Sequence, residues 1–242
     1  MIERDIEKRA AAYVEDLLPD CISLLCRMTA VEAPTGDEGA RAELLRSIFL
    51  EAGLDDVSID DIGNVTGIRR GQTRRAILLE AHMDTVFPRG TVTAAPSVID
   101  GEIHCPGVGD NTVGLVPVIT ALKVLNHLGI QTRHDLIFAG TVREEGLGNL
   151  GGIRRLIDTF RNSLDACITV DGFQYQDIVY KGSGIHTERI CFNGRGGHSA
   201  ERDIYPQALL AAAAAAERIG RLPLPGTQTI AVTSFRAGNG TA

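Results

Sequence analysis

Apolar and polar positions along the chain follow a helical rhythm at first and a mixed helical and extended rhythm afterwards. Apolar residues recur every three or four positions through residues 5–29 and 38–52, which predicts helices there, with Pro19 kinking the first or starting a second. Beyond residue 55, short apolar runs alternate with longer amphipathic stretches. The predicted strands are 57–59, 65–68, 77–80, 135–141 and 166–170, and the predicted helices between them are 112–128 and 149–160.

Apolar strands that alternate with helices are typical of a parallel sheet covered by helices on both faces. Residues 1–181 are therefore predicted to form one α/β domain with a doubly wound, mostly parallel sheet. A different rhythm follows the glycines at 182 and 184. Its predicted elements are an alternating strand at 185–193, a Gly-rich turn, an Ala-rich helix at 204–219 and a strand at 229–235. This pattern predicts the beginning of an α+β domain over residues 182–242.

Composition narrows the class of function. The chain has 242 residues with 24 basic and 31 acidic side chains, which give a net charge of −7. This charge argues against nucleic-acid binding, because binding to phosphates needs a basic face. The longest apolar run has nine residues, against the ~20 that span a bilayer, and the amino-terminal stretch lacks the apolar core of a signal peptide. Five scattered cysteines form no CxxC pair, which favours reduced thiols. We expect a cytoplasmic protein that binds neither nucleic acid nor membrane.

Acidic residues and a histidine stand at the carboxyl ends of the predicted strands, where open α/β sheets bind their ligands. These residues are His82 and Asp84, Asp110 just ahead of the helix at 112, Glu144 and Glu145, and Asp171. Histidine with several carboxylates is a ligand set for Zn²⁺, Mn²⁺ or Co²⁺. Of two adjacent glutamates, one can bind a metal while the other acts as a general base toward a water. The sequence predicts a metal site at this edge.

Each of these residues also has an ordinary structural interpretation. His82 fits a hydrogen-bonded core histidine, Asp110 a helix cap, and the other acids solvated turns. Their joint occurrence at one edge favours the metal site. A dinucleotide site is also suggested by GVGDNTVG, but the spacing is not GxGxxG. A serine hydrolase acting through Ser183 or Ser199 would need a GxSxG elbow, which the sequence lacks.

Five segments resemble those of the co-catalytic dinuclear zinc metallopeptidases, a family that includes peptidase T, glutamate carboxypeptidase and aminoacylase. In chain order they are AHMDTVFPRG, PGVGDNTVG, TVREEGLGNLGG, TVDGF and NGRGGHSA, and the EEGLGNLGG form is most similar to peptidase T-like members. The resemblance implies a zinc-exopeptidase-like fold with a lid. It implies a hydrolase that cleaves peptide or acyl-amino-acid amide bonds through a metal-bridging water. It also implies two divalent ions, zinc first with cobalt or manganese as alternatives, and a homodimer formed through the lid.

The resemblance also implies a role for each site residue. His82 and Asp171 would bind the first metal, and Asp84 would orient His82. Asp110 would bridge the two metals, and Glu145 would bind the second. Glu144 would be the general base, and His198 would bind the substrate carbonyl oxygen.

Thr112 stands where many relatives have lysine. The family's longer C-terminal stretch brings a final histidine to the second metal, and no histidine follows His198 here. We therefore expect a truncated chain with an incomplete lid and weak or no activity; the alternative to an enzyme is a remnant that retains partial metal binding.

Overall fold

The computed structural model describes residues 2–172, 177–182, 184–195 and 207–237. The chain divides into two compact units, Met1–Tyr180 and Lys181–Ala242, and each is described by itself. The first unit holds a central sheet and its covering helices. That these units are a catalytic domain over 1–181 and a partial lid over 182–242 stays a prediction.

The first unit begins with three helices, which are followed by five strands and then by helices and strands in alternation. The helices are α1 (Ile2–Asp16), α2 (Leu18–Thr29), α3 (Gly39–Glu51), α4 (Val113–His127) and α5 (Gly151–Phe160), with short helical turns η1 (Val108–Thr112) and η2 (Gly146–Gly148). The strands are β1 (Asp55–Ile59), β2 (Val65–Arg69), β3 (Ala76–His82), β4 (Ser97–Ile99), β5 (Glu102–His104), β6 (Asp135–Thr141) and β7 (Leu164–Thr169). Pro19 lies in the first turn of α2, where its missing N–H removes no helical hydrogen bond. The strands and helices predicted for this unit are confirmed, and the β4–β5 hairpin is an addition.

The central sheet has the strand order β1-β2-β6-β3-β7. β3 is parallel to both β6 and β7, whereas β2 is antiparallel to β6 and β1. Four of these five strands therefore share one direction, which confirms the mostly parallel α/β fold. In the register of β3 and β6, Ala76 pairs with Asp135 and His82 pairs with Thr141. Because the two strands begin and end together, the segments that follow them leave from the same edge.

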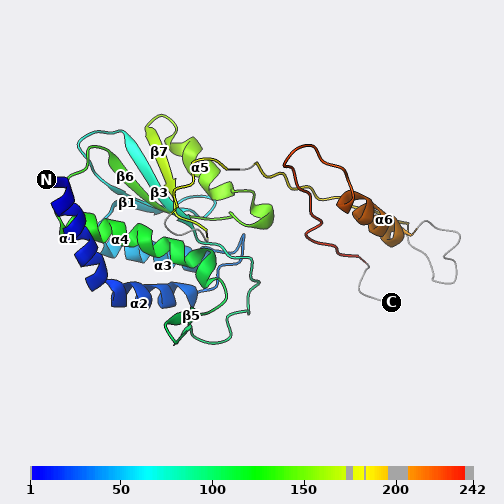
Figure 1. Cartoon of the computed structure of the whole chain (residues 1–242), viewed down its shortest axis with the longest axis horizontal. Helices are drawn as coiled ribbons and strands as arrows, with labels where there is room; N and C mark the ends of the chain where they lie inside the picture. The colour runs from blue at the N-terminus through cyan, green and yellow to red at the C-terminus, as the bar shows by residue number, and fades with distance from the viewer. Residues whose placement is uncertain (1, 173–176, 183, 196–206, 238–242) are drawn as a thin grey trace. The chain divides into compact units, whose positions relative to one another are not determined.

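Helices cover both faces of this sheet, as Figure 1 shows, with α2, α3 and α4 on one side and α5 on the other. Neighbouring residues of β6 divide between the two cores. Phe138 packs in the cluster that contains Phe49 of α3 and Leu122 of α4, while Ile137 packs with Leu156 of α5. Side chains of a strand alternate between faces, so a strand such as β6, which is apolar over residues 136–140, can serve two layers. The sheet is doubly wound, as predicted.

The segment Val108–His127, which contains α4, is long and apolar enough to cross a membrane by length and composition alone. Half of its most apolar window is buried inside the protein. Leu115, Ile119 and Leu122 are almost fully buried in the main core cluster. This is the pattern of a core helix packed against a sheet.

The described part of the second unit contains one helix, α6 (Ala208–Gly220), within the region where the sequence predicts one. The strands predicted at 185–193 and 229–235 are wrong, because those described residues form no strand. Alternation favours a strand only when a neighbouring strand supplies its hydrogen bonds and a second layer covers its apolar face. Here Ile185 is 88% exposed and Ile190 is 60% exposed.

Candidate metal centre

The carboxyl edge of the parallel strands gathers the predicted site residues. β3 ends at His82, which is followed by Asp84, and β6 ends opposite it and is followed by Glu144 and Glu145. Asp171 follows β7, and Asp110 lies in η1 directly before α4. The structure therefore brings six of the seven predicted side chains to one place. The seventh, His198, lies outside the described residues, as do Ser183 and Ser199.

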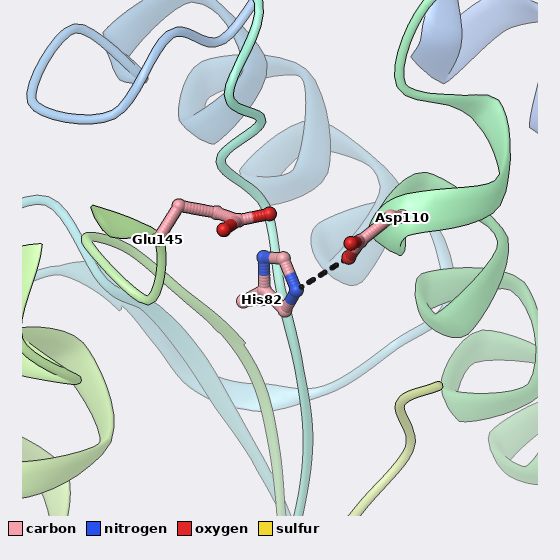
Figure 2. A group of neighbouring side chains, drawn as sticks. All are labelled: His82, Asp110 and Glu145. Carbon is pink, nitrogen blue, oxygen red and sulfur yellow. Dashed lines mark ion pairs between the residues drawn. The ribbon is translucent and has the colours of Figure 1, made fainter. Parts of the chain in front are cut away.

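His82 stands at the centre of this group and is 2% exposed. Its Nε2 atom lies 3.2 Å from Asp110 Oδ1, 3.9 Å from Asp171 Oδ1 and 4.0 Å from Glu144 Oε2. Figure 2 shows His82, Asp110 and Glu145 converging from three separate segments of the chain. One ligand atom from each of these three residues lies within 4.8 Å of the other two. Such spacing brings the three donor groups close enough to hold metal between them.

The orientation of the His82 ring is fixed by Asp84. The Nδ1 atom of His82 lies 3.0 Å from the backbone carbonyl oxygen of Asp84, which can only accept a hydrogen bond. Nδ1 therefore carries the proton and Nε2 faces the carboxylates, which is the arrangement in which an imidazole can bind a metal. The Asp84 carboxylate is 3.5 Å from the same Nδ1 atom, so it supports the ring less directly than the carbonyl does.

The Asp84 carboxylate also holds the acidic pair in place. It is fully buried and accepts hydrogen bonds from the backbone N–H groups of Glu144, at 2.9 Å, and Glu145, at 3.0 Å. The hydroxyl of Thr35 donates a further hydrogen bond at 2.9 Å. Burial alone would raise the pKa of Asp84, but the hydrogen bonds from His82 and from these donors lower it. One carboxylate thus links the ends of β3 and β6.

Three further polar residues, which no sequence motif marks, support these loops. Glu38 accepts a hydrogen bond from the N–H of Arg143, Asn64 accepts one from the N–H of Val142, and Asn111 donates one to the carbonyl oxygen of Val170. Each lies far along the chain from the segment it holds. A single sequence shows no local signal for such contacts; their common feature is burial of a polar side chain.

Arginine and lysine do not neutralise the negative charge of this site. Among residues 5–172, none of them forms an ion pair with Asp84, Asp110, Glu144, Glu145 or Asp171, and the basic partner in this site is His82. Burial and the neighbouring acids raise the pKa of Glu144 and of Glu145. Burial disfavours a charge on His82, but Asp84 and the other acids outweigh it and raise the pKa of His82 to about 9. A cation would relieve this excess of negative charge.

The donor set fits a divalent transition metal. One imidazole nitrogen and several carboxylate oxygens suit Zn²⁺, Mn²⁺ or Co²⁺, whereas Mg²⁺ and Ca²⁺ take oxygen ligands only. The Nε2 atom of His82 already faces the carboxylates, and its partly exposed neighbours Asp110 and Asp171 leave the site open to solvent. An ion held here would keep positions free for a water or a substrate.

Comparison with known proteins gives a family and a fold. The profile of Peptidase family M20/M25/M40 matches residues 78–237. Carboxypeptidase G2 of Pseudomonas sp. strain RS-16 is 27% identical over 198 residues, covering 76% of this chain and 46% of that protein. The peptidase T-like protein RB0614 of Rhizobium meliloti is 27% identical over 197 residues, covering 66% and 47%. The crystal structure of aminopeptidase PepT from Bacillus cereus matches with a TM-score of 0.52 at 24% identity, covering 63% and 43%, which shows the fold alone.

The chain spans less than half the length of the curated relatives it matches. The covered share of those proteins ranges from 35% to 47%. The matched family region begins inside β3 and includes every predicted site residue, from His82 to His198.

Proposed function

The chain belongs to peptidase family M20/M25/M40, and on that premise we propose that it is a metal-dependent hydrolase of peptide or acyl-amino-acid amide bonds. The observation that supports this most directly is the convergence of His82, Asp110 and Glu145 beside a fourth residue, Glu144, that is free to act on a water. The relatives include proteins described as a carboxypeptidase and a peptidase T-like protein. Small peptides and acyl-amino acids are therefore the substrates to test first.

The proposed ligands divide between two ions, with zinc first and cobalt or manganese as alternatives. His82 and Asp171 would hold the first ion, Glu145 the second, and Asp110 would contact both. When bound, such ions polarise a substrate carbonyl and lower the pKa of a water. Asp84 would keep Nε2 of His82 directed into the site through the contact at Nδ1.

Glu144 is the proposed general base. Its side chain is about one-third exposed, it reaches within 4.0 Å of His82 Nε2, and its pKa is raised by burial and by the acids around it. A carboxylate with a raised pKa can take a proton from the attacking water and pass it to the departing amide nitrogen. The hydrogen bond from its backbone N–H to Asp84 fixes its position.

The remaining parts of the proposal concern residues and partners beyond the described site. We propose that His198 contacts the substrate carbonyl oxygen, that residues 182–242 contribute to a lid through which two copies associate, and that the protein acts in the cytoplasm. The second candidate function is a weakly active remnant that retains partial metal binding. It rests on the triad of His82, Asp110 and Glu145, which could hold an ion whether or not hydrolysis follows.

Replacing Glu144 by glutamine tests the proposal. With Zn²⁺ present, the wild-type chain is expected to hydrolyse at least one substrate in a panel of di- and tripeptides and acyl-amino acids. Glu144→Gln should lower kcat by about 100- to 10,000-fold because it removes the base, and it should bind zinc as tightly as wild type. Metal binding without any hydrolysis by the wild type would favour the remnant. Wild-type protein that binds no divalent metal would contradict both candidates.

A further inference from the structure

Arg41 of α3 is one of the most deeply buried side chains of the protein, at 1% exposure. Its guanidinium donates four hydrogen bonds. Nε and Nη2 donate to the carbonyl oxygen of Val31 at 2.8 and 2.6 Å, and Nη1 donates to the carbonyl oxygen of Met83 at 2.7 Å and to Thr112 Oγ1 at 3.0 Å. The planar fork of an arginine can reach three segments in this way, which a lysine ammonium on its flexible stem cannot do as rigidly.

Two of these contacts fall on the segments that carry the candidate metal ligands. Met83 lies between His82 and Asp84, so its carbonyl oxygen belongs to the backbone that places both side chains. Thr112 lies two residues after Asp110 and closes the same turn, because its hydroxyl donates to the carbonyl oxygen of Gly107 at 2.7 Å. Arg41 therefore fixes the end of β3 and the η1 turn relative to one another.

The charge of Arg41 is buried without a carboxylate partner among the described side chains. Within residues 5–172, no carboxylate lies at ion-pair distance from it, and burial lowers its pKa to about 10, with the charges of Cys105 and Asp84 opposing that change. Arg41 is thus charged at neutral pH inside the protein. A buried cation without an ion-pair partner costs stability. An apolar side chain could fill this part of the core in place of Arg41, so the buried arginine points to a role other than stabilising the core.

We propose that Arg41 is a positioning residue for the metal centre, which sets the separation of His82 and Asp110 by bonding Met83 and Thr112 at the same time. This inference rests on the proposed function, since it takes His82 and Asp110 as ligands. Preorganised ligand loops bind a metal more tightly than loops that the metal must order. Replacing a residue that orients a ligand typically lowers metal affinity by about 10- to 100-fold.

Titration of the metal-free full chain with Co²⁺ tests the proposal, with the absorption spectrum of the bound ion as a readout of its coordination. Thr112→Val removes the hydroxyl while keeping the shape of the side chain, and Thr112→Ser is the matched control that keeps the hydroxyl. Arg41→Lys keeps the charge and removes the fork. Thr112→Val and Arg41→Lys should each weaken Co²⁺ binding about 10- to 100-fold and alter the spectrum. Thr112→Ser should bind as wild type does.

A structural role without positioning predicts a different pattern. Phe49→Leu changes a fully buried core side chain on the same helix and should lower the thermal unfolding midpoint while leaving Co²⁺ affinity and spectrum unchanged. The effects of Arg41→Lys and Thr112→Val should also be less than additive in the double variant, because both remove one shared contact. If Arg41→Lys fails to fold, the valine and serine variants at 112 still decide the question.

The outcomes separate this inference from the proposed function. If wild type binds Co²⁺ and His82→Ala does not, the result supports the candidate metal centre. Unchanged affinity in folded Arg41→Lys and Thr112→Val would then overturn the role of Arg41 alone. Affinity losses that follow the loss of stability, as measured against Phe49→Leu, would overturn it as well. If wild type does not bind Co²⁺, or if His82→Ala binds it equally well, the metal centre itself is wrong and the inference falls with it.

Discussion

The two edges of the central sheet carry acidic side chains in opposite settings. At the amino ends of the parallel strands, Asp135 pairs with Arg70 at 2.8 Å and Asp165 pairs with Arg75 and His134. At the carboxyl ends, five acids surround one histidine, and no arginine or lysine of residues 5–172 forms an ion pair with them. The same strands therefore present a neutralised edge and an acidic edge.

The pKa values follow this division. Burial would raise the pKa of Asp135, but the N–H of Gly71 and the charge of Arg70 outweigh it, so the pKa is lowered. The pKa of Glu144 and that of Glu145 are raised by burial and by the neighbouring acids. Acids paired with arginine stabilise the fold they belong to, whereas a cluster of acids without arginine or lysine partners destabilises it. The difference distinguishes acids that stabilise the fold from acids that are candidates for binding a metal ion.

Removing a candidate metal ligand should give the largest difference between the two edges, measured as Zn²⁺ affinity and as stabilisation by Zn²⁺. His82→Ala deletes the only nitrogen donor of the candidate triad and should weaken Zn²⁺ binding by more than about 100-fold. At a Zn²⁺ concentration 100 times the wild-type Kd, binding stabilises the wild type by about 2.7 kcal/mol, and His82→Ala should lose most of this. Thermal unfolding with and without Zn²⁺ measures both quantities. Asp135→Asn is the control at the other edge, and an equal loss there would contradict the contrast.

Two glycines allow the same change to be made at each edge. A Cβ atom on Gly114 would lie 2.3 Å from Asn111 Oδ1 and 2.6 Å from the carbonyl oxygen of Val170, and one on Gly71 would lie 2.2 Å from the carbonyl oxygen of His134. Gly114→Ala and Gly71→Ala should each lower the free energy of unfolding by roughly 1–3 kcal/mol, because the backbone must move. Chemical denaturation measures this loss.

The two alanine variants should differ in metal binding. Gly114→Ala disturbs the hydrogen bond between Asn111 and Val170, which joins the segments of Asp110 and Asp171, so Zn²⁺ affinity should fall. Gly71→Ala should leave the affinity of the folded protein unchanged. Equal affinity in both variants would show that the contact between those segments does not shape the site.

The sequence predicts the parallel core and the acidic edge well, for a physical reason. β6 has a continuous apolar run over residues 136–140 and is buried on both faces, so its identity as a central strand is encoded locally. The position of a side chain just after a parallel strand then places it at a known edge of the sheet, as for Glu144 and Asp171. Periodicity and strand direction together suffice for these residues.

Contacts between distant segments lie outside what such patterns encode. Arg41 and Asn64 resemble surface residues in the sequence, yet they bond to loops some 40 and 80 residues away. The β4–β5 hairpin escapes detection because its short strands are mostly exposed and bury no apolar face. The predicted strand at 185–193 fails for the opposite reason, since it has the alternating pattern without a partner strand among the described residues.

The smallest expected effect concerns the neutralised edge and its dependence on pH. Asp135 accepts hydrogen bonds from Arg70 Nη1 and from the N–H of Gly71, both at 2.8 Å. Asp135→Asn removes the charge from this pair and should cost about 1 kcal/mol at pH 7. Urea unfolding of both proteins from pH 7 to pH 3 measures the difference. Asp61→Asn, in an exposed pair with Arg155, is the control and should change stability by less than about 0.5 kcal/mol.

The sign of the pH dependence follows from the lowered pKa of Asp135. Because its pKa is lower in the folded state than the value of about 3.9 in an unfolded chain, its contribution is complete above that value and is lost as the pH falls through the folded pKa. The stability gap between wild type and Asp135→Asn should therefore be constant near neutrality and close toward pH 3. A gap that persists at low pH would mean that Asp135 acts through shape instead of charge, and the amino edge would then no longer serve as the electrostatic counterpart of the candidate metal centre.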